Sequence, residues 1–242
     1  MRIPKVPSLL HFARFASKDV KKIEADLRRM AERPPRINYL PSKKGAWDHV
    51  VLGVSAAQVL GAVERIKGER QRNVNLAALT AFMTLAPALV GRNFAEVEVK
   101  YYPIGRKLFV PVNPFLYTSG RDIQSLLWPS FWKNLTLKEY QLAVYATILD
   151  LMFFHSPDYA GCSLELADLG CLPGEDIRKP HFIRRSDLPT MTTRELKEYT
   201  DPFVETFLKL VAEIRGSAEK SKKPEARSEA PQDWYLDQPP PK

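Results

Sequence analysis

The chain has 242 residues, of which 45% are hydrophobic and 26% are charged, a balance typical of one globular domain with extensions. Two cysteines are too few for a disulfide framework, which favours a reducing compartment or a free-thiol fold. The formal net charge is +8, but residues 1–50 contain twelve Lys or Arg and only five Asp or Glu. Most of the positive charge is therefore N-terminal, which disfavours a nucleic-acid-binding face spread over the chain.

The first segment, residues 1–17, is basic and amphipathic and contains no acidic residue. Arg2 and Arg14 interleave with apolar side chains, and no continuous apolar run of a secretory signal is present. This composition predicts either a mitochondrial targeting segment or a basic N-terminal arm, and the sequence leaves both open.

Residues 18–215 are expected to form a single, mainly helical domain. Residues 18–33 have the apolar stripe of an amphipathic helix, and residues 34–46 resemble an extended linker. Two uncharged segments follow, at 50–63 and 73–91. The second is long enough to approach the thickness of a bilayer, so the pair is interpreted either as packed core helices or as a contact with the mitochondrial inner membrane.

Residues 96–112 carry the signal of a β-hairpin. Apolar and polar residues alternate up to Tyr102, Gly105 is expected to supply the turn, and Pro111 places the second strand at an edge. Arg106 and Lys107, together with the tyrosines, have the chemistry of an RNA-binding surface. Protection of an edge strand by charge explains the same residues, and we favour that interpretation.

An aromatic-rich segment follows the hairpin and is interrupted by Pro114 and Pro129, which suggests irregular structure. So many large rings need burial in the chain or in a partner, and we expect them to dock a partner protein. The tail, residues 216–242, is Pro-rich and charged, is expected to be disordered, and contains a second aromatic cluster. The predicted partner-binding residues are Phe115, Tyr117, Trp128, Phe131, Trp132, Trp234, Tyr235 and Leu236.

Two further helices begin at capping boxes. Thr136 and Glu139 open an apolar helix that reaches residue 154, and Thr192 and Glu195 open a helix over 193–215. Asp150 lies inside the apolar helix, where a carboxylate needs a salt bridge or a capping partner.

A search for catalytic motifs finds no P-loop, no GxGxxG, no HExxH and no CxxC, and no catalytic residue or cofactor is predicted. Four potential metal ligands fall within 27 residues: His155, Cys162, Cys171 and His181. Their gaps of 7, 9 and 10 residues do not match the short ligand pairs of zinc sites. We therefore expect buried free cysteines and no zinc.

The fold class predicted is mainly α with one β-hairpin, an α+β protein with a helical core, an N-terminal arm and a C-terminal tail. The function expected is that of a non-catalytic accessory subunit of a large mitochondrial assembly, a respiratory-chain or ATP-synthase complex, bound to neighbouring protein subunits. Two alternatives stay open: a mitochondrial ribosomal protein that contacts rRNA, and a small zinc- or thiol-dependent enzyme.

Overall fold

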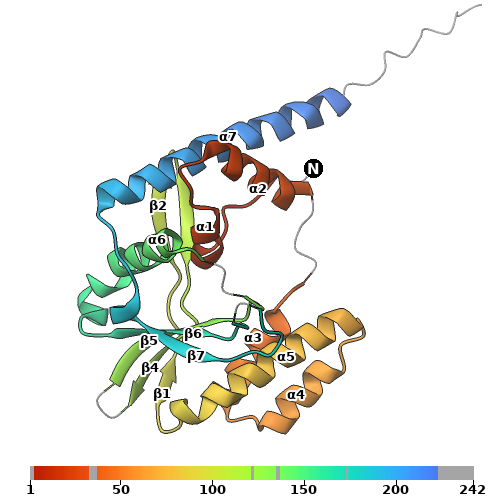
Figure 1. Ribbon diagram of the computed structural model, residues 1–242, viewed down its shortest axis with the longest axis vertical. Coiled ribbons are helices and arrows are strands. Elements are labelled where there is room, and N and C mark those ends of the chain that lie inside the picture. Colours follow the sequence, from red (N-terminus) through yellow and green to blue (C-terminus); the bar gives the residue numbers. More distant parts are fainter. Residues whose placement is uncertain (1–2, 33–36, 121–122, 135–136, 173, 223–242) are drawn as a thin grey trace, which may run out of the picture.

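The computed structural model describes residues 3–32, 37–120, 123–134, 137–172 and 174–222. Within these ranges the chain has seven α-helices, a five-stranded mixed sheet and a separate two-stranded hairpin (Figure 1). The α+β class is confirmed, and so is the predicted hairpin. The five-stranded sheet was not predicted from the sequence.

Five helices and one 3₁₀ turn precede the sheet. The expected helix over 50–63 is interrupted, because Gly53 adopts a left-handed conformation (φ 67°) and Ser55 forms a capping box with Gln58. The predicted linker 34–46 is also different, since a helix begins at Leu40. The elements are α1 (Leu9–Phe15), α2 (Val20–Glu32), α3 (Leu40–Leu52), α4 (Ala56–Glu64), α5 (Glu69–Leu85) and η1 (Ala86–Leu89).

The sheet has the strand order β1-β4-β5-β6-β7, and its central pair, β5 and β6, is parallel while the other pairs are antiparallel. The two parallel strands are joined through α6 (Glu139–Leu149) and a π-helical turn (Asp150–Phe154), because parallel neighbours need a crossover connection. The strands are β1 (Asn93–Ala95), β4 (Leu116–Gly120), β5 (Ile123–Ser130), β6 (Ser163–Asp168) and β7 (His181–Arg184).

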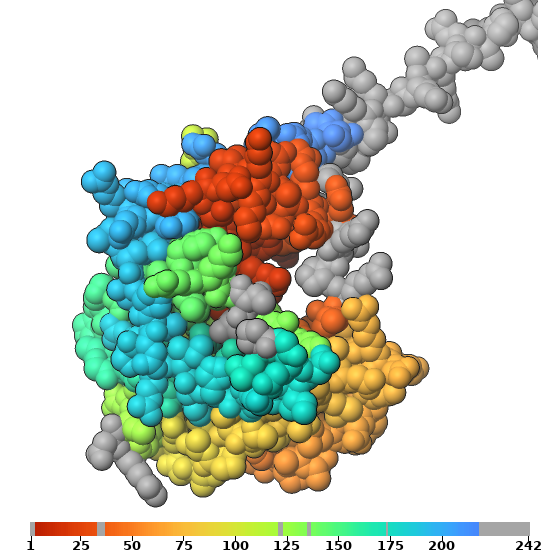
Figure 2. Space-filling model, viewed as in Figure 1, coloured from red at the N-terminus to blue at the C-terminus, as the bar shows by residue number. Residues whose placement is uncertain are grey.

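The sheet separates two hydrophobic cores. Leu127 on β5 faces the helices α3, α4 and α5, together with Leu116 and Ala167. Leu126 and Trp128, which alternate with Leu127, belong to the opposite core with α1, α6 and the C-terminal helix. Figure 2 shows a surface hollow between the red N-terminal residues and the orange residues at the start of α3.

The hairpin and the last helix complete the fold. Strand β2 (Lys100–Gly105) lies against α7 (Thr193–Lys222), and its partner β3 (Leu108–Val112) lies against α1, while α7 also packs along α2 (Figure 1). The capping box at Thr192 and Glu195 is confirmed, with the Thr192 amide donating to the Glu195 carboxylate at 2.8 Å and the Glu195 amide donating back to the Thr192 hydroxyl at 3.2 Å. The helix continues seven residues beyond the predicted end at 215.

The N-terminal segment differs most from its prediction. Helix α1 is not a surface arm, because Leu9 and Phe12 are fully buried and the Phe12 ring lies 4.9 Å from the ring of Phe203 on α7. Its end is held by the buried Gln141 of α6, whose Nε2 donates to the Arg14 carbonyl at 2.7 Å. Lys5 and Arg14 remain exposed while the apolar stripe fills the core.

The aromatic segment also differs from its prediction. Residues expected to be irregular form β4 and β5, and Trp128 packs edge-to-face on Tyr145 of α6 with ring centroids 5.4 Å apart. Because β5 is the central strand and is covered on both faces, its apolar residues run consecutively rather than alternating. Pro129 is tolerated near the end of the strand.

Residues 50–63 and 73–91 place apolar side chains against the sheet within the α3–α5 layer. Across the described ranges, no helix combines the length and the apolar character that a membrane crossing requires. The capping box at Thr136 cannot be evaluated because Thr136 lies outside the described residues, and α6 begins at Glu139.

Replacement of Phe12 by alanine tests the role of α1. We expect Phe12→Ala to lower the free energy of unfolding by about 3–5 kcal/mol, because it removes a fully buried ring and leaves a cavity. Phe109→Ala is the matched control: its ring is 47% exposed, so the same substitution should cost no more than about 1 kcal/mol. Urea unfolding followed by circular dichroism measures both. Equal losses would show that α1 does not belong to the core.

Candidate interaction surface

The four potential metal ligands are not brought together. Cys162 precedes β6 and Cys171 follows it, so the two buried thiols lie at opposite ends of the strand. Each has a separate local partner, with the Cys162 sulfur 3.8 Å from the Gln124 amide oxygen and the Cys171 sulfur 3.3 Å from the Asp176 carbonyl. Burial raises the pKa of the Cys162 thiol, which disfavours the reactive thiolate.

The two histidines are equally separate. His155 lies at the surface with its Nε2 3.5 Å from Asp150, and the ring of His181 contacts the Lys179 carbonyl at 3.2 Å. In the described part of the chain, no three His, Cys, Asp or Glu side chains form a group that could hold a metal ion.

Asp150 has the charged partner that its position in an apolar helix requires. Arg185 forms an ion pair with it, and the Arg185 guanidinium stacks 4.1 Å from the centre of the Phe154 ring.

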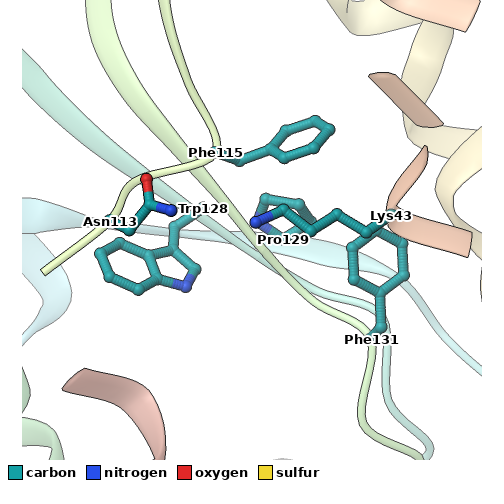
Figure 3. A pocket seen from close by; sticks show the side chains of 6 residues that line it. All are labelled: Lys43, Asn113, Phe115, Trp128, Pro129 and Phe131. Carbon is teal, nitrogen blue, oxygen red and sulfur yellow. The ribbon is translucent and has the colours of Figure 1, made fainter. Parts of the chain in front are cut away.

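A small cavity lies beside the end of β5 (Figure 3). Its volume is about 60 Å³, enough for a few water molecules and far below the ~300 Å³ of ordinary ligand pockets. The Lys43 amine lies 5.8 Å from the centre of the Phe115 ring, and desolvation by its surroundings lowers its pKa. The lining residues are Lys43, Asn113, Phe115, Trp128, Pro129 and Phe131.

A row of polar residues crosses the same end of the sheet. Ser130 pairs in register with Asp168, and Asp168 pairs with His181. Burial raises the pKa of Asp168, whose carboxylate accepts a hydrogen bond from the Gly170 amide at 2.9 Å. A serine nucleophile needs an imidazole beside its hydroxyl, whereas here the carboxyl residue lies between the serine and the histidine. The order of the three residues therefore does not activate Ser130.

A second polar cluster ties four consecutive parts of the sheet together. Arg92 donates to both oxygens of Glu165, at 2.5 and 3.2 Å, and the two side chains are only 11% and 14% exposed. Ser125 donates to Glu165 at 2.8 Å and contacts the Thr118 hydroxyl at 2.9 Å. Because each charge and hydroxyl has a partner inside the cluster, its chemistry is structural.

The outward face of the hairpin has a different character. Tyr101 pairs with Pro111 across the two strands, and Pro103 pairs with Phe109, so the four side chains share one face. Tyr101 is 59% exposed and Phe109 is 47% exposed, whereas the alternating residues Ile104, Val110 and Val112 are buried in the core. A solvent-facing strand surface normally carries polar residues, and this one carries two aromatic rings and two prolines.

The tip of the hairpin carries two cations in an unfavourable backbone conformation. Arg106 (φ 46°) and Lys107 (φ 62°) form a two-residue loop, and in the described ranges they are the non-glycine residues with positive φ. The turn therefore does not depend on Gly105 alone, as the sequence suggested. Such loops favour Asn-Gly, and each other L-residue there costs about 1–2 kcal/mol. The chain retains two basic side chains at a position where smaller residues would be more stable.

The edges of the hairpin are poorly suited to strand addition. Within the described residues β2 and β3 pair only with each other, and each contains a proline that has no N–H to offer to a further strand. A partner would therefore meet the flat face and the basic tip. We call this surface the hairpin face and define it as Tyr101, Pro103, Arg106, Lys107, Phe109 and Pro111.

The sequence predicted other residues as the partner-binding set, and the structure places them elsewhere. Phe115, Trp128 and Phe131 are buried in the chain's own cores. Tyr117 and Trp132 are half-buried, and Trp132 packs edge-to-face on His11 at 4.7 Å. Trp234, Tyr235 and Leu236 lie outside the described residues. The hairpin alternation contained the signal for Tyr101 and Phe109, but the sequence could not show which face of the hairpin is outside.

No protein-family model matches this sequence, and no curated protein is significantly similar to it.

The cluster around Arg92 gives a stability test. Glu165→Gln should lower the free energy of unfolding by about 3 kcal/mol, because it leaves the largely buried Arg92 without a counter-charge. Glu213→Gln is the matched control, since Glu213 pairs with Arg28 at 2.6 Å but is 40% exposed, and we expect a loss below about 1 kcal/mol. Chemical unfolding of the two variants in parallel measures the difference. Similar losses would mean that the sheet does not depend on this ion pair.

Proposed function

We propose that this chain is a non-catalytic accessory subunit of a large protein assembly, and that the hairpin face is its docking surface. The observation that carries the proposal is the exposure of Tyr101 and Phe109 beside two prolines, on a face whose opposite side is buried in the core. Aromatic and arginine residues are enriched where proteins dock, and an exposed apolar patch with a charged border is typical of an interaction site.

The backbone conformation of the tip supports the same proposal. Keeping Arg106 and Lys107 in a loop that favours Asn-Gly lowers the stability of the free chain. Strained positions of this kind concentrate at functional sites, where a side chain is needed despite its conformational cost. Two cations next to an apolar face suit a partner whose own apolar patch is bordered by carboxylates.

We place the assembly in the mitochondrion, with a respiratory-chain or ATP-synthase complex as the proposed partner. This part of the proposal rests on the acid-free, basic composition of residues 1–17. Because α1 fills the core between α6 and α7, we also propose that the segment stays attached after import. The neighbours would be protein subunits, and the apolar side chains of residues 50–63 and 73–91, which lie in α3, α4, α5 and η1, would serve the chain's own core rather than a membrane contact.

Contact with rRNA, as in a mitochondrial ribosomal protein, is the alternative that the same residues suggest. An RNA-binding surface depends on a stripe of several cations that neutralise phosphates. At the hairpin, Arg106 and Lys107 are accompanied by the exposed acids Glu96 and Glu98 at its base. The apolar centre and the mixed charge favour a protein partner.

Removal of the two exposed rings tests the docking surface. The double variant Tyr101→Ser, Phe109→Ser should keep its thermal midpoint within a few degrees, because both side chains are exposed. It should lose comigration with the high-molecular-weight complex on native gels of solubilised mitochondria. The matched control is Leu52→Ser, Ile177→Ser, which removes side chains that are 60% and 75% exposed elsewhere on the surface. Normal assembly of the hairpin variant would refute the proposal. If the natural chain comigrates with RNA in a salt-sensitive complex instead of with a protein complex, the ribosomal alternative is favoured.

The mitochondrial location is tested separately. A fluorescent protein fused after residues 1–18 should accumulate in mitochondria, and Arg2→Glu with Arg14→Glu should abolish import because it removes the positive charge of the segment. Fluorescence microscopy of living cells gives the readout. A diffuse cytosolic signal from the unmodified fusion would contradict the mitochondrial assignment without affecting the docking surface.

A further inference from the structure

We infer that the chain's own C-terminal tail binds the hairpin face, with Trp234, Tyr235 and Leu236 covering its aromatic and proline residues. The inference goes beyond the proposed function: it describes the chain before a partner is bound. It rests on the hairpin face, on the chemistry of the tail sequence and on the length of chain that follows α7.

The chemistry of the two surfaces is complementary. The tail sequence reads DWYLD at 233–237, with Asp233 and Asp237 on either side of the three apolar residues. The hairpin face has the converse arrangement, with Tyr101 and Phe109 beside the cations Arg106 and Lys107. Aromatic rings pack well on proline and on other rings, and opposite charges at the border set the register of such a contact.

The geometry permits the contact. The hairpin lies against α7 and meets it in the half of the helix nearer Thr193 (Figure 1). The helix has 30 residues and rises 1.5 Å per residue, so the half nearer Thr193 lies between about 22 and 44 Å from Lys222 along the helix axis. Twelve residues lead from Lys222 to Trp234, and an extended chain of that length reaches up to about 40 Å. Most of this interval is therefore within reach.

Covering the face within the same chain also solves a physical problem. Exposed rings and prolines at the hairpin would otherwise promote association of the free subunit. A tethered segment meets the face at an effective concentration in the millimolar range, so even a weak contact is populated. A partner with a larger complementary surface can then displace the tail.

The test uses the full chain labelled with 5-fluorotryptophan. The chain has four tryptophans, and Trp234→Phe identifies the ¹⁹F resonance of Trp234. We expect the chemical shift of this resonance to differ from that of a synthetic peptide of residues 229–242. It should move to the peptide's chemical shift in two double variants, first Arg106→Asn with Lys107→Gly and second Tyr101→Ser with Phe109→Ser. The first of these variants installs the favoured loop residues, so it should fold at least as stably as the natural chain. Lys67→Asn, Arg70→Gln removes two exposed cations elsewhere and should leave the resonance unchanged.

Three outcomes would overturn the inference. A Trp234 resonance at the peptide position in the natural chain would show a free tail. A resonance that differs from the peptide's but does not change in either hairpin variant would show that the tail binds another surface. A displacement that depends on protein concentration would identify a second copy as the occupant. In each case the native-gel result for Tyr101→Ser, Phe109→Ser still decides the proposed function independently.

Discussion

The burial of β5 on both faces is the constraint on which the rest of the structure depends. Leu127 faces the α3–α5 layer, and Leu126 and Trp128 face α1 and α6, so this strand carries the centre of both cores. Its parallel pairing with β6 requires the crossover through α6, and α6 in turn supplies Tyr145 and Gln141. The first and last helices belong to the same core, since α1 packs between α6 and α7.

The polar residues of the sheet serve this arrangement. Arg92 and Glu165 close the rim of the α3–α5 core and connect the start of β1 to β6, with Ser125 and Thr118 completing the row. A carboxylate so little exposed to water is tolerated because a bidentate guanidinium and a hydroxyl both contact it. The charged and hydroxyl side chains of this cluster thus bond to one another across the strands.

The hairpin is governed by a different balance. Its inner side chains join the core, its outer face exposes Tyr101 and Phe109, and its tip carries two residues whose backbone conformation lowers the stability of the free chain. The prolines disfavour addition of a further strand at either edge, so the contact that the hairpin offers lies on its flat face. At the hairpin tip, Arg106 and Lys107 occupy a loop whose backbone conformation favours other residues. This conflict distinguishes the hairpin from the remaining surface, where exposed apolar residues such as Leu52 and Ile177 lie in α3 and in a loop.

Elements that depend on short-range bonds could be predicted from the sequence. The helix after Thr192, the hairpin over 96–112 and the need of Asp150 for a partner were predicted because each follows from residues that are close in the chain. The other elements depend on long-range packing and could not be predicted in this way. Strand β5 has no alternation because both of its faces are buried, so its period carries no signal.

The remaining decisions depended on residues far apart in the chain. In the sequence, α1 resembles a free amphipathic segment. The side chain that covers it in the fold, Phe203, lies 191 residues after Phe12. The face on which Tyr101 is exposed likewise depended on where α7 and α1 pack against the hairpin, and only the tertiary fold brings those elements together.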